Sequence, residues 1–402
     1  MNKEKIKKQK RKINQDWRTF SGSYKNINEM VNTTISRLSV IGEKQNTRNG
    51  SAVCLYDQEV VMLNPLARHL HLQGRTNNIF GTIGEMFWVM AGEKNIRPVL
   101  EFFVPRAPLY SDDDKTWHAS YGDRLWNYKQ IDHAVKMFQV DGLLTRRSTS
   151  SIYIPELDAY ENYMRVEGSM KDVPCNQWIN YYVQKFDNSY LFNMKVNARS
   201  NDIIFGLGNI NIPEFTLIQE MMCSIVKELY PNEDIELGVY KHNATNLHVY
   251  DALEKQFKNI LDGSEYNKNV AIPKGSDYLE AKFPSVLNKE TGELDVYIIQ
   301  RFFSEIVKLF AECITNLETD LTVGIDYGIF AVNGIFKKYD VETENNSLYA
   351  YAVLCLYYIF GKRNRNIVMD FYQATRIEDS KLVEGLPMAI LNSGFRNFEL
   401  IL

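Results

Sequence analysis

The sequence predicts a mixed fold of helices and strands, of the α/β or α+β class. Short apolar runs of strand length recur through the first half of the chain, and longer stretches between them carry apolar residues spaced by three and four. From about residue 262 the chain becomes rich in turn-forming residues, and strong helical patterns follow. We therefore expect a mixed domain over residues 26–265 and a largely helical extension over residues 266–402.

The predicted strands are short runs of apolar and β-branched or aromatic residues. They cover residues 52–55, 59–63, 99–104, 151–154, 181–186 and 191–196. Runs of this length and composition favour strands over helices when turn-forming residues bound them. These segments are expected to form a mixed sheet at the centre of the domain.

The predicted helices are longer. Residues 79–90 form an apolar stretch around Glu85, and residues 213–229 place a proline in the first helical turn, a position that suits proline. Further helices are expected over residues 296–317 and 348–360. The run 348–360 is the most apolar part of the chain, but it is shorter than the roughly 20 residues that a membrane-spanning helix needs. We expect it to be a buried helix.

Composition favours a small-molecule partner. The chain has 402 residues, 45% of them hydrophobic, and a formal net charge of −4, so a full-sized core is expected and nucleic acid is an unlikely partner. Residues 1–25 contain a basic run without an apolar stretch behind it, which is typical of a solvated arm and not of a signal peptide. Docking of this arm on nucleic acid or on a partner protein remains the alternative.

Cysteine usage indicates a reducing compartment, which we take to be the cytoplasm. The five cysteines are widely spread and none lies in a CxxC pair: Cys54, Cys175, Cys223, Cys313 and Cys355. This pattern argues against a disulfide framework and against a structural zinc site. No metal and no membrane association are expected.

One cysteine lies among residues suited to nucleophilic chemistry. Cys175 stands in DVPCNQW, Arg199 follows in ARSNDIIFGLGNINIPEF, and His248 and Tyr250 stand in NLHVY. A thiol, a fixed cation and hydrogen-bonding groups are what covalent attack on an anionic polar small molecule requires. Together these strings resemble the thymidylate synthase family, over most of residues 40–260. The resemblance implies a mixed sheet flanked by helices, with one sheet face forming a homodimer interface.

The resemblance also implies catalytic roles. Cys175 matches the nucleophile and Glu85, in IFGTIGEMFWVMAG, the catalytic glutamate, whose pKa should rise because its neighbours are apolar. Tyr121, in SYGDRLW, matches a tyrosine that lines the site. Arg199 matches an arginine beside the thiol, where a cation lowers the pKa of the cysteine.

Further matches concern the nucleotide. The residues implied to hold its phosphate are Arg48, Arg199 and Ser200, together with Arg146 and Arg147, which in this family reach across a twofold dimer interface. His248 and Tyr250 match residues that hold the sugar hydroxyl.

The remaining matches concern the base and the folate. Asn211 matches the asparagine that reads the pyrimidine edge if one extra residue is accepted after Asp202; Asn209 is the alternative register. The NIPEF string keeps the family spacing to Phe215 and favours Asn211. Asp202 and Trp88 match positions at the folate. The implied co-substrate is 5,10-methylenetetrahydrofolate.

The segment before Tyr121 bears on the product. Thymidylate synthases carry a tryptophan-rich segment here, whose indole shields the intermediate from water, whereas this chain has EFFVPRAPLYSDDDKTWHASYGDRLW. Trp117 lies too close to Tyr121 to match that indole. The string resembles the nucleotide hydroxymethylases of bacteriophages and antibiotic pathways, and loss of the shield favours hydration. With asparagine reading the base, the resemblance implies hydroxymethylation of dUMP by a phage enzyme.

Three alternatives remain open. A thymidylate synthase with an unusual water shield would share the same residues but would use the hydride of the folate. A dCMP hydroxymethylase would require Asn211 to be misaligned. A catalytically idle binding protein would keep its function after mutation of Cys175, whereas an enzyme would lose it.

Overall fold

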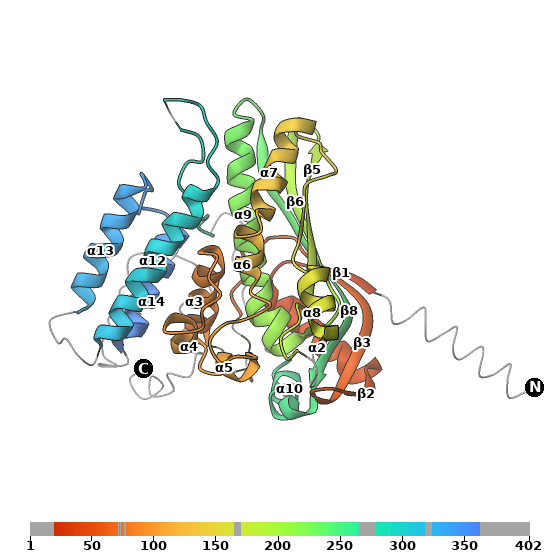
Figure 1. Cartoon of the computed structure of the whole chain (residues 1–402). Helices are drawn as coiled ribbons and strands as arrows, with labels where there is room; N and C mark the ends of the chain where they lie inside the picture. The colour runs from red at the N-terminus through yellow and green to blue at the C-terminus, as the bar shows by residue number, and fades with distance from the viewer. Residues whose placement is uncertain are drawn as a thin grey trace, which may run out of the picture.

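The computed structural model describes residues 20–361, apart from residues 71, 73, 76–77, 165–169, 265–277, 289 and 318–323. Most of the predicted basic arm (residues 1–19), the predicted boundary at 265 and the end of the predicted extension (residues 362–402) lie outside the described residues. A single sheet stands on one side of the molecule, helices lie against it, and helices of the C-terminal part form a further layer (Figure 1).

The sheet is mixed, as predicted. Its strands are β1 (Phe20–Tyr24), β2 (Glu43–Thr47), β3 (Gly50–Met62), β4 (Thr149–Ser151), β5 (Asn176–Phe186), β6 (Ser189–Ala198), β7 (Asn201–Asp202) and β8 (Ile235–Tyr250). The order is β1-β3-β8-β6-β5-β4, with β2 paired to β3 and β7 to β8. β8 runs antiparallel to β3 but parallel to β6. This long central strand therefore joins the two halves of the sheet.

The helices fall into two groups. Those of the first part are α2 (Ile27–Ile41), α3 (Ile79–Met90), α4 (Val99–Phe103), α5 (Ala107–Tyr110), α6 (Tyr121–Trp126), α7 (Gln130–Asp141), α8 (Glu161–Met164), α9 (Ile212–Leu229) and α10 (Glu254–Asp262), with the π-helices η1 (Glu156–Tyr160) and η2 (Ile203–Asn211) and the 3-10 helix η3 (Asp251–Leu253). Those of the C-terminal part are α12 (Tyr297–Asn316), α13 (Ile325–Lys338) and α14 (Ser347–Gly361). α9 packs on the sheet, and α3 lies between α9 and the C-terminal helices (Figure 1).

Helix α3 is buried along its whole length. It contacts α9 on one side and α4, α12 and α14 on the others. Tyr358 of α14 stacks on Phe80 of α3, with ring centroids 4.4 Å apart, and on Phe103 of α4 at 5.7 Å. A helix that is apolar on all sides must be covered on all sides, and the C-terminal helices supply this cover.

Most predicted elements are confirmed. The helices predicted at 79–90, 213–229, 296–317 and 348–360 correspond to α3, α9, α12 and α14, and the runs 181–186 and 191–196 lie in β5 and β6. The run 52–55 and residues 59–62 of the run 59–63 belong to one strand, β3, in which Asp57 adopts a φ of 50° between them. Of the run 151–154, Ser151 alone belongs to a strand, at the end of β4.

The strand predicted over residues 99–104 is wrong, because Val99–Phe103 form helix α4. A short apolar run has no period that separates a strand from a buried helix. Here Val99, Leu100 and Phe103 are buried, and Phe103 packs against the aromatic rings of α12 and α14. Contacts with helices distant in the sequence therefore accompany the helical state of this run.

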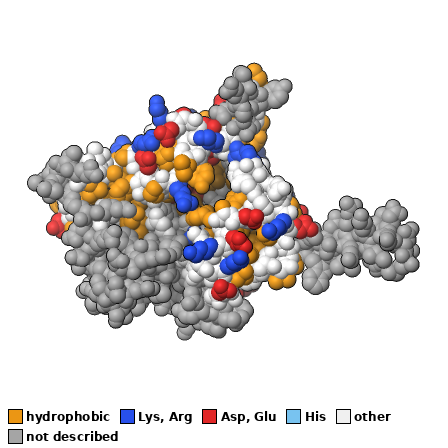
Figure 2. All heavy atoms as spheres, turned by 90° about the horizontal axis from the view of Figure 1, so that it is seen from below, with side chains coloured by type: hydrophobic (Ala, Val, Ile, Leu, Met, Phe, Trp, Pro, Cys, Tyr) orange, Lys and Arg blue, Asp and Glu red, His pale blue; other side chains and the backbone are white. Residues whose placement is uncertain are grey.

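Charges are mixed on the molecular surface. On the face shown in Figure 2, lysine and arginine side chains alternate with acidic ones and with hydrophobic ones. None of the described helices is long and apolar enough to cross a membrane.

Candidate active site

Cys175 lies directly before β5, and the register of the β5–β6 hairpin brings Arg199 to it. Asn176 pairs with Ala198 across the two antiparallel strands, and the Arg199 backbone N–H donates to the Cys175 carbonyl oxygen at 2.9 Å. Cys175 is partly exposed, whereas the other four cysteines are buried. The sheet itself thus places the predicted nucleophile beside the predicted arginine.

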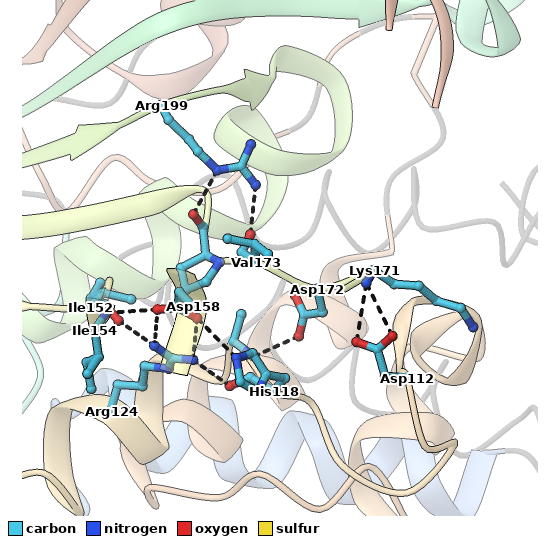
Figure 3. Close-up of polar contacts among 12 residues, drawn as sticks. Asp112, His118, Arg124, Ile152, Ile154, Asp158, Lys171, Asp172, Val173 and Arg199 are labelled. Atoms are coloured by element: carbon cyan, nitrogen blue, oxygen red, sulfur yellow. Dashed lines mark hydrogen bonds and ion pairs between the residues drawn. The ribbon is translucent and has the colours of Figure 1, made fainter. Parts of the chain in front are cut away.

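Two predicted phosphate ligands bind the main chain that leads to the cysteine. Arg199 donates from Nε to the Pro174 carbonyl oxygen at 3.1 Å and from Nη2 to that of Val173 at 2.8 Å (Figure 3). Arg48 donates in the same way to the carbonyl oxygens of residues 170 and 171, at 2.8 and 2.9 Å. A guanidinium group has five N–H donors in a planar fork, so both side chains are positioned and keep donors for an anion.

The pKa of Cys175 is raised, because burial outweighs the nearby charges. Arg199 and Arg48 lower this pKa, as expected for cations beside a thiol, while Asp172 raises it. The predicted effect of Arg199 is therefore present, but the net lowering that it implied is not. Without a ligand, the thiol form of Cys175 is favoured.

A buried ionic cluster, absent from the sequence analysis, supports the same segment (Figure 3). Arg124 donates from Nη2 to Asp158 Oδ1 at 2.9 Å, and His118 Nε2 lies 3.1 Å from the same oxygen. Next to it, Asp172 accepts the Ala119 N–H at 2.8 Å, and burial raises the pKa of Asp172 to about 6. Each of these residues is an ordinary polar residue in the sequence, so nothing there distinguished them.

The helix side of the site carries two buried carboxyl groups. Burial raises the pKa of Glu85 on α3 to about 8, which confirms the expected direction. The pKa of Glu214, in the first turn of α9, is raised well above its ordinary value by burial and then by the Glu85 carboxylate. Two carboxyl groups that repel each other's ionisation retain at least one proton near neutral pH. The sequence analysis missed Glu214.

Tyr121 lies between the nucleophile and these carboxyl groups. Its hydroxyl oxygen accepts a hydrogen bond from Asn176 Nδ2 at 2.9 Å, and its ring lies 5.6 Å from that of Phe215 on α9. Its pKa is raised well above the ordinary value by burial, and then by the charges of Cys175 and Glu214. Three elements, α6, β5 and α9, therefore meet at this tyrosine.

The predicted sugar ligands continue the site along β8. Ser200 Oγ lies 3.5 Å from His248 Nδ1, and Asp202 is paired with His248 across β7 and β8. Burial lowers the pKa of His248 to about 4, so the imidazole is neutral at pH 7. Tyr250 is edge-on to His248, and its hydroxyl oxygen accepts from Asn49, the neighbour of Arg48, at 3.5 Å.

Asp202 caps the π-helix η2 and keeps a spare acceptor. Its Oδ1 accepts the backbone N–H groups of Ile204 and Phe205, at 2.9 and 2.6 Å. Its Oδ2 is buried and has no hydrogen-bond partner among the described residues. Burial raises the pKa of Asp202 to about 6. A buried acceptor without a partner is unfavourable unless a ligand supplies a donor.

The two candidate registers for the base-reading asparagine differ in surroundings. Asn209 Oδ1 and its carbonyl oxygen accept from Thr82 Oγ1 of α3, at 3.3 and 3.0 Å. Asn211 instead accepts at Oδ1 from Asn201 Nδ2 at 3.0 Å. It also lies close enough to Glu214 to affect its pKa. Asn209 is thus engaged with α3, while Asn211 contacts Asn201 of β7 and Glu214 of α9.

Three predicted site residues are not brought to this cluster within one chain. Trp88 is buried, donates from Nε1 to the Asn95 carbonyl oxygen at 2.9 Å, and packs against Trp117. Arg146 and Arg147 are exposed. Arg147 forms an ion pair with Asp141, donating from Nε to Oδ2 at 2.7 Å. Within the described residues, no group of three or more potential metal ligands is present.

Comparison with known proteins identifies the family of this chain. A family model described as "Thymidylate synthase" matches residues 30–278. The chain belongs to the thymidylate synthase family. It is 33% identical over 381 residues to a protein of Delftia phage PhiW-14 named "Deoxyuridylate hydroxymethyltransferase", covering 94% of this chain and 96% of that protein.

A protein of Pseudomonas phage M6 with the same name is 27% identical over 240 residues, covering 59% of this chain and 64% of that protein. A solved thymidylate synthase from T4 phage superposes with a TM-score of 0.48 at 16% identity, over 69% of this chain and 91% of that one.

The C-terminal helices lie outside the part of the chain that matches the family model. The family model ends at residue 278, before α12 begins at Tyr297. The match to the PhiW-14 protein nevertheless covers 94% of this chain, so it must include most of the C-terminal part. The extension is therefore shared with that relative, although it lies outside the family model.

Proposed function

We propose that the protein is a deoxyuridylate hydroxymethylase. It transfers a one-carbon unit from 5,10-methylenetetrahydrofolate to carbon 5 of dUMP and adds water, giving 5-hydroxymethyl-dUMP and tetrahydrofolate. The observation that carries the proposal is the 33% identity, over 94% of this chain, to a phage protein named "Deoxyuridylate hydroxymethyltransferase", in a chain whose sheet register joins Cys175 to Arg199. The proposed setting is the reducing cytoplasm of a phage-infected host.

In this proposal the nucleotide is held by its phosphate and by its sugar. Arg48, Arg199 and Ser200 bind the phosphate, with charge-assisted hydrogen bonds of the strong, bidentate kind. His248 and Tyr250, adjacent on β8, hold the sugar hydroxyl. Because Arg48 and Arg199 also bind the main chain before Cys175, phosphate binding and placement of the thiol are mechanically linked.

The chemistry begins at Cys175. Its sulfur forms a bond to carbon 6 of the pyrimidine, and carbon 5 becomes nucleophilic. The thiol must lose its proton for this step, although burial raises its pKa; the positive charges of Arg199 and Arg48 favour the thiolate. Methylenetetrahydrofolate, when bound, supplies the one-carbon unit. Carbon 5 then loses its proton and tetrahydrofolate departs, which leaves an exocyclic methylene group on the pyrimidine, to which water adds.

Glu85 is the residue proposed to orient and activate that water. Its raised pKa suits proton transfer near neutral pH. Glu214 shares the proton of this buried pair, and Tyr121 links the pair to the nucleophile through Asn176. Water adds at the exocyclic methylene carbon and returns an electron pair to the ring, and loss of the Cys175 sulfur from carbon 6 then restores the pyrimidine and releases the product.

Asp202 fits the proposed folate site. Its buried Oδ2 lacks a partner among the described residues, and the pterin ring presents N–H donors to which such an acceptor is complementary. Trp88 is proposed to contribute to the folate site through the packing of its ring, since its indole N–H already donates to the Asn95 carbonyl oxygen.

The proposed assembly is a homodimer through the outer face of the sheet. On β5, Trp178 and Phe186 point outward, 40% and 57% exposed. Isologous contact between two such faces would bury them. Arg146 and Arg147 are exposed on one chain, as a role at the phosphate of the other subunit requires.

Mass spectrometry of the nucleotide product tests the proposal. The purified protein is incubated with methylenetetrahydrofolate and either dUMP or dCMP, with Cys175→Ala as the blank. A hydroxymethyl group on dUMP, with tetrahydrofolate released, is the expected result. A methyl group with dihydrofolate identifies a thymidylate synthase instead, and product from dCMP alone contradicts the assignment of Asn211.

Subunit complementation tests the shared site. Cys175→Ala and the double variant Arg146→Ala/Arg147→Ala are each expected to be nearly inactive. Mixing them should restore part of the activity, because mixed dimers contain one site with both the thiol and the arginines. Arg301→Ala is the matched control, since this exposed arginine on α12 forms an ion pair with Asp295. No recovery on mixing would contradict the proposed interface.

A further inference from the structure

A chain of buried polar groups runs from the central strand to Asn211. Tyr240 and His242 project from β8 toward the helices, and Tyr240 Oη lies 2.8 Å from His242 Nδ1. His242 Nε2 lies 3.1 Å from Asn201 Nδ2. The same Asn201 nitrogen lies 3.0 Å from Asn211 Oδ1. All four residues are buried, and of these only Asn211 has an expected role, as the residue that reads the pyrimidine edge.

The protons of this chain are determined by its contacts. A carboxamide nitrogen is a donor and never an acceptor, so Asn201 donates to Asn211 Oδ1 and to His242 Nε2. A neutral imidazole has one N–H and one acceptor nitrogen. With Nε2 accepting, the proton of His242 must be on Nδ1, from which it is donated to the Tyr240 oxygen.

Burial keeps the chain neutral, so its orientation does not change with pH near neutrality. Burial lowers the pKa of His242 to about 3. The pKa of Tyr240 is raised well above its ordinary value by burial, then by Glu214 and Tyr121. Glu214 is a titratable neighbour of this chain, and Asn211 favours its ionised form, as expected if Asn211 Nδ2 faces that carboxyl group.

Gly206 of η2 contributes to the placement of Asn201. A Cβ atom on Gly206 would overlap the Asn201 Oδ1 atom, so the carbonyl end of this amide lies against the glycine. The nitrogen end then faces His242 and Asn211. Both the strand and the π-helix therefore favour the same orientation of the Asn201 amide.

Resting on the proposed function, we propose that Tyr240, His242 and Asn201 fix which way round Asn211 presents its amide, and thereby make the site select uracil over cytosine. With Oδ1 held by Asn201, Nδ2 is presented as a donor. Uracil offers an acceptor oxygen at carbon 4, whereas cytosine offers a donor amino group there. The three residues act on specificity as positioning residues, through Asn211.

The opposite arrangement would have the opposite consequence. If His242 carried its proton on Nε2, Asn201 would have to turn its oxygen toward the imidazole. Asn211 would then turn its nitrogen toward Asn201 and its oxygen toward the base. An acceptor in that position is complementary to the amino group of cytosine, so the tautomer of one buried histidine and the base preference are coupled.

Substitution of Asn201 tests the coupling. In Asn201→Asp an ionised side chain can only accept, so it should bind His242 Nε2–H and reverse the Asn211 amide. The ratio of the dCMP to the dUMP dissociation constant, measured by calorimetry without folate, should fall by at least about tenfold, because a mispaired buried polar group discriminates strongly. Asn201→Leu removes the constraint, so dUMP should bind about three- to tenfold more weakly without a reversed preference.

The control is Thr216→Val on α9. This substitution removes a buried hydroxyl group that donates a hydrogen bond to the Ile212 carbonyl oxygen of the same helix. It should leave the ratio unchanged. If the wild-type protein binds dUMP better than dCMP and Asn201→Asp does not change the ratio, the inference is wrong while the proposed function stands. If the wild-type protein binds neither nucleotide, both are wrong.

Nitrogen NMR of the free protein gives a reading that is independent of nucleotide binding. The ¹⁵N shifts of His242 should report a protonated Nδ1 and an unprotonated Nε2, assigned by comparison with His242→Gln. In Asn201→Asp the proton should move to Nε2 or the ring should become charged. A protonated Nε2 in the wild-type protein would overturn the proposal.

Discussion

On the strand side of the site, Arg48 and Arg199 are exposed cations bound to main-chain carbonyl groups; on the helix side, Glu85 and Glu214 are buried acids with raised pKa values. The strand side is fixed by sheet register, which depends on backbone hydrogen bonds. The helix side is fixed by side-chain packing, which for α3 includes the C-terminal helices. A perturbation of packing should therefore affect the acids and spare the arginines.

The largest expected effect belongs to the strand side. Replacing Cys175 by alanine removes the nucleophile, and kcat should fall by at least about 10⁴-fold, as for covalent enzymes that lose theirs. Cys313→Ala, a buried cysteine on α12, should retain most activity. Steady-state kinetics with dUMP checks both, and substantial turnover by Cys175→Ala would contradict covalent catalysis.

On the helix side, Glu85→Gln should lower kcat by about 10²- to 10⁴-fold, the range for loss of a general acid or base. The same substitution should raise the stability of the folded protein above neutral pH, although it lowers activity. A carboxyl group whose pKa rises on folding, here from 4.5 to about 8, binds protons more tightly in the native state. The native protein therefore loses stability as pH rises between these values.

The variant lacks this titration. Glu85→Gln should thus be more stable than the wild-type protein at pH 8 by about 1 kcal/mol or more, and the difference should shrink toward pH 4. Thermal unfolding across this pH range measures it. A difference that grows toward low pH would contradict the buried state of Glu85.

The C-terminal helices provide an intermediate effect. Tyr358→Ala removes the ring that stacks on Phe80 and Phe103, and should lower the free energy of unfolding by about 3 to 5 kcal/mol. At temperatures where the variant remains folded, kcat should fall more than the affinity for dUMP, since α3 carries Glu85. Phe330→Ala, at an exposed site on α13, is the matched control. It should change neither the free energy of unfolding nor kcat.

The smallest effect is expected at the surface. Asp141→Asn removes the ion-pair partner of Arg147, an exposed pair of the kind that stabilises proteins little. The unfolding temperature should not change measurably. If Arg147 binds phosphate in the other subunit, its release should lower the KM for dUMP by up to about threefold. An increased KM would show that Asp141 instead positions this arginine.

The sequence predicted the helix side of the fold better than the sheet. The apolar patterns of α3, α9, α12 and α14 were sufficient, because burial of a long helix leaves a clear periodic or wholly apolar signal. Strand β8 was missed although it is the centre of the sheet. Its inward-facing positions include His242 and His248, so polar residues interrupt the alternation by which a strand is recognised.

The site divides in the same way. Strings such as DVPCNQW and NLHVY identified candidates for chemistry, because a reactive group and its neighbours are contiguous there. Glu214, Asp172 and the Tyr240–His242–Asn201 chain were not found, since their significance comes from partners on other elements. Arg146 and Arg147 stay predictions, because one chain does not contain the surface that they are proposed to reach.

The π-helical turn η2 bears on the extra residue that the Asn211 register implies. In an ordinary α-helix one inserted residue rotates everything after it by about 100°, which would turn the buried face of α9 away from the sheet. A turn with wider hydrogen-bonded rings can take in a single residue locally. One residue can therefore be inserted between Asp202 and Asn211, within η2, without a change in the orientation of α9, which follows it. Insertion, and not substitution alone, is open to the evolution of such a site.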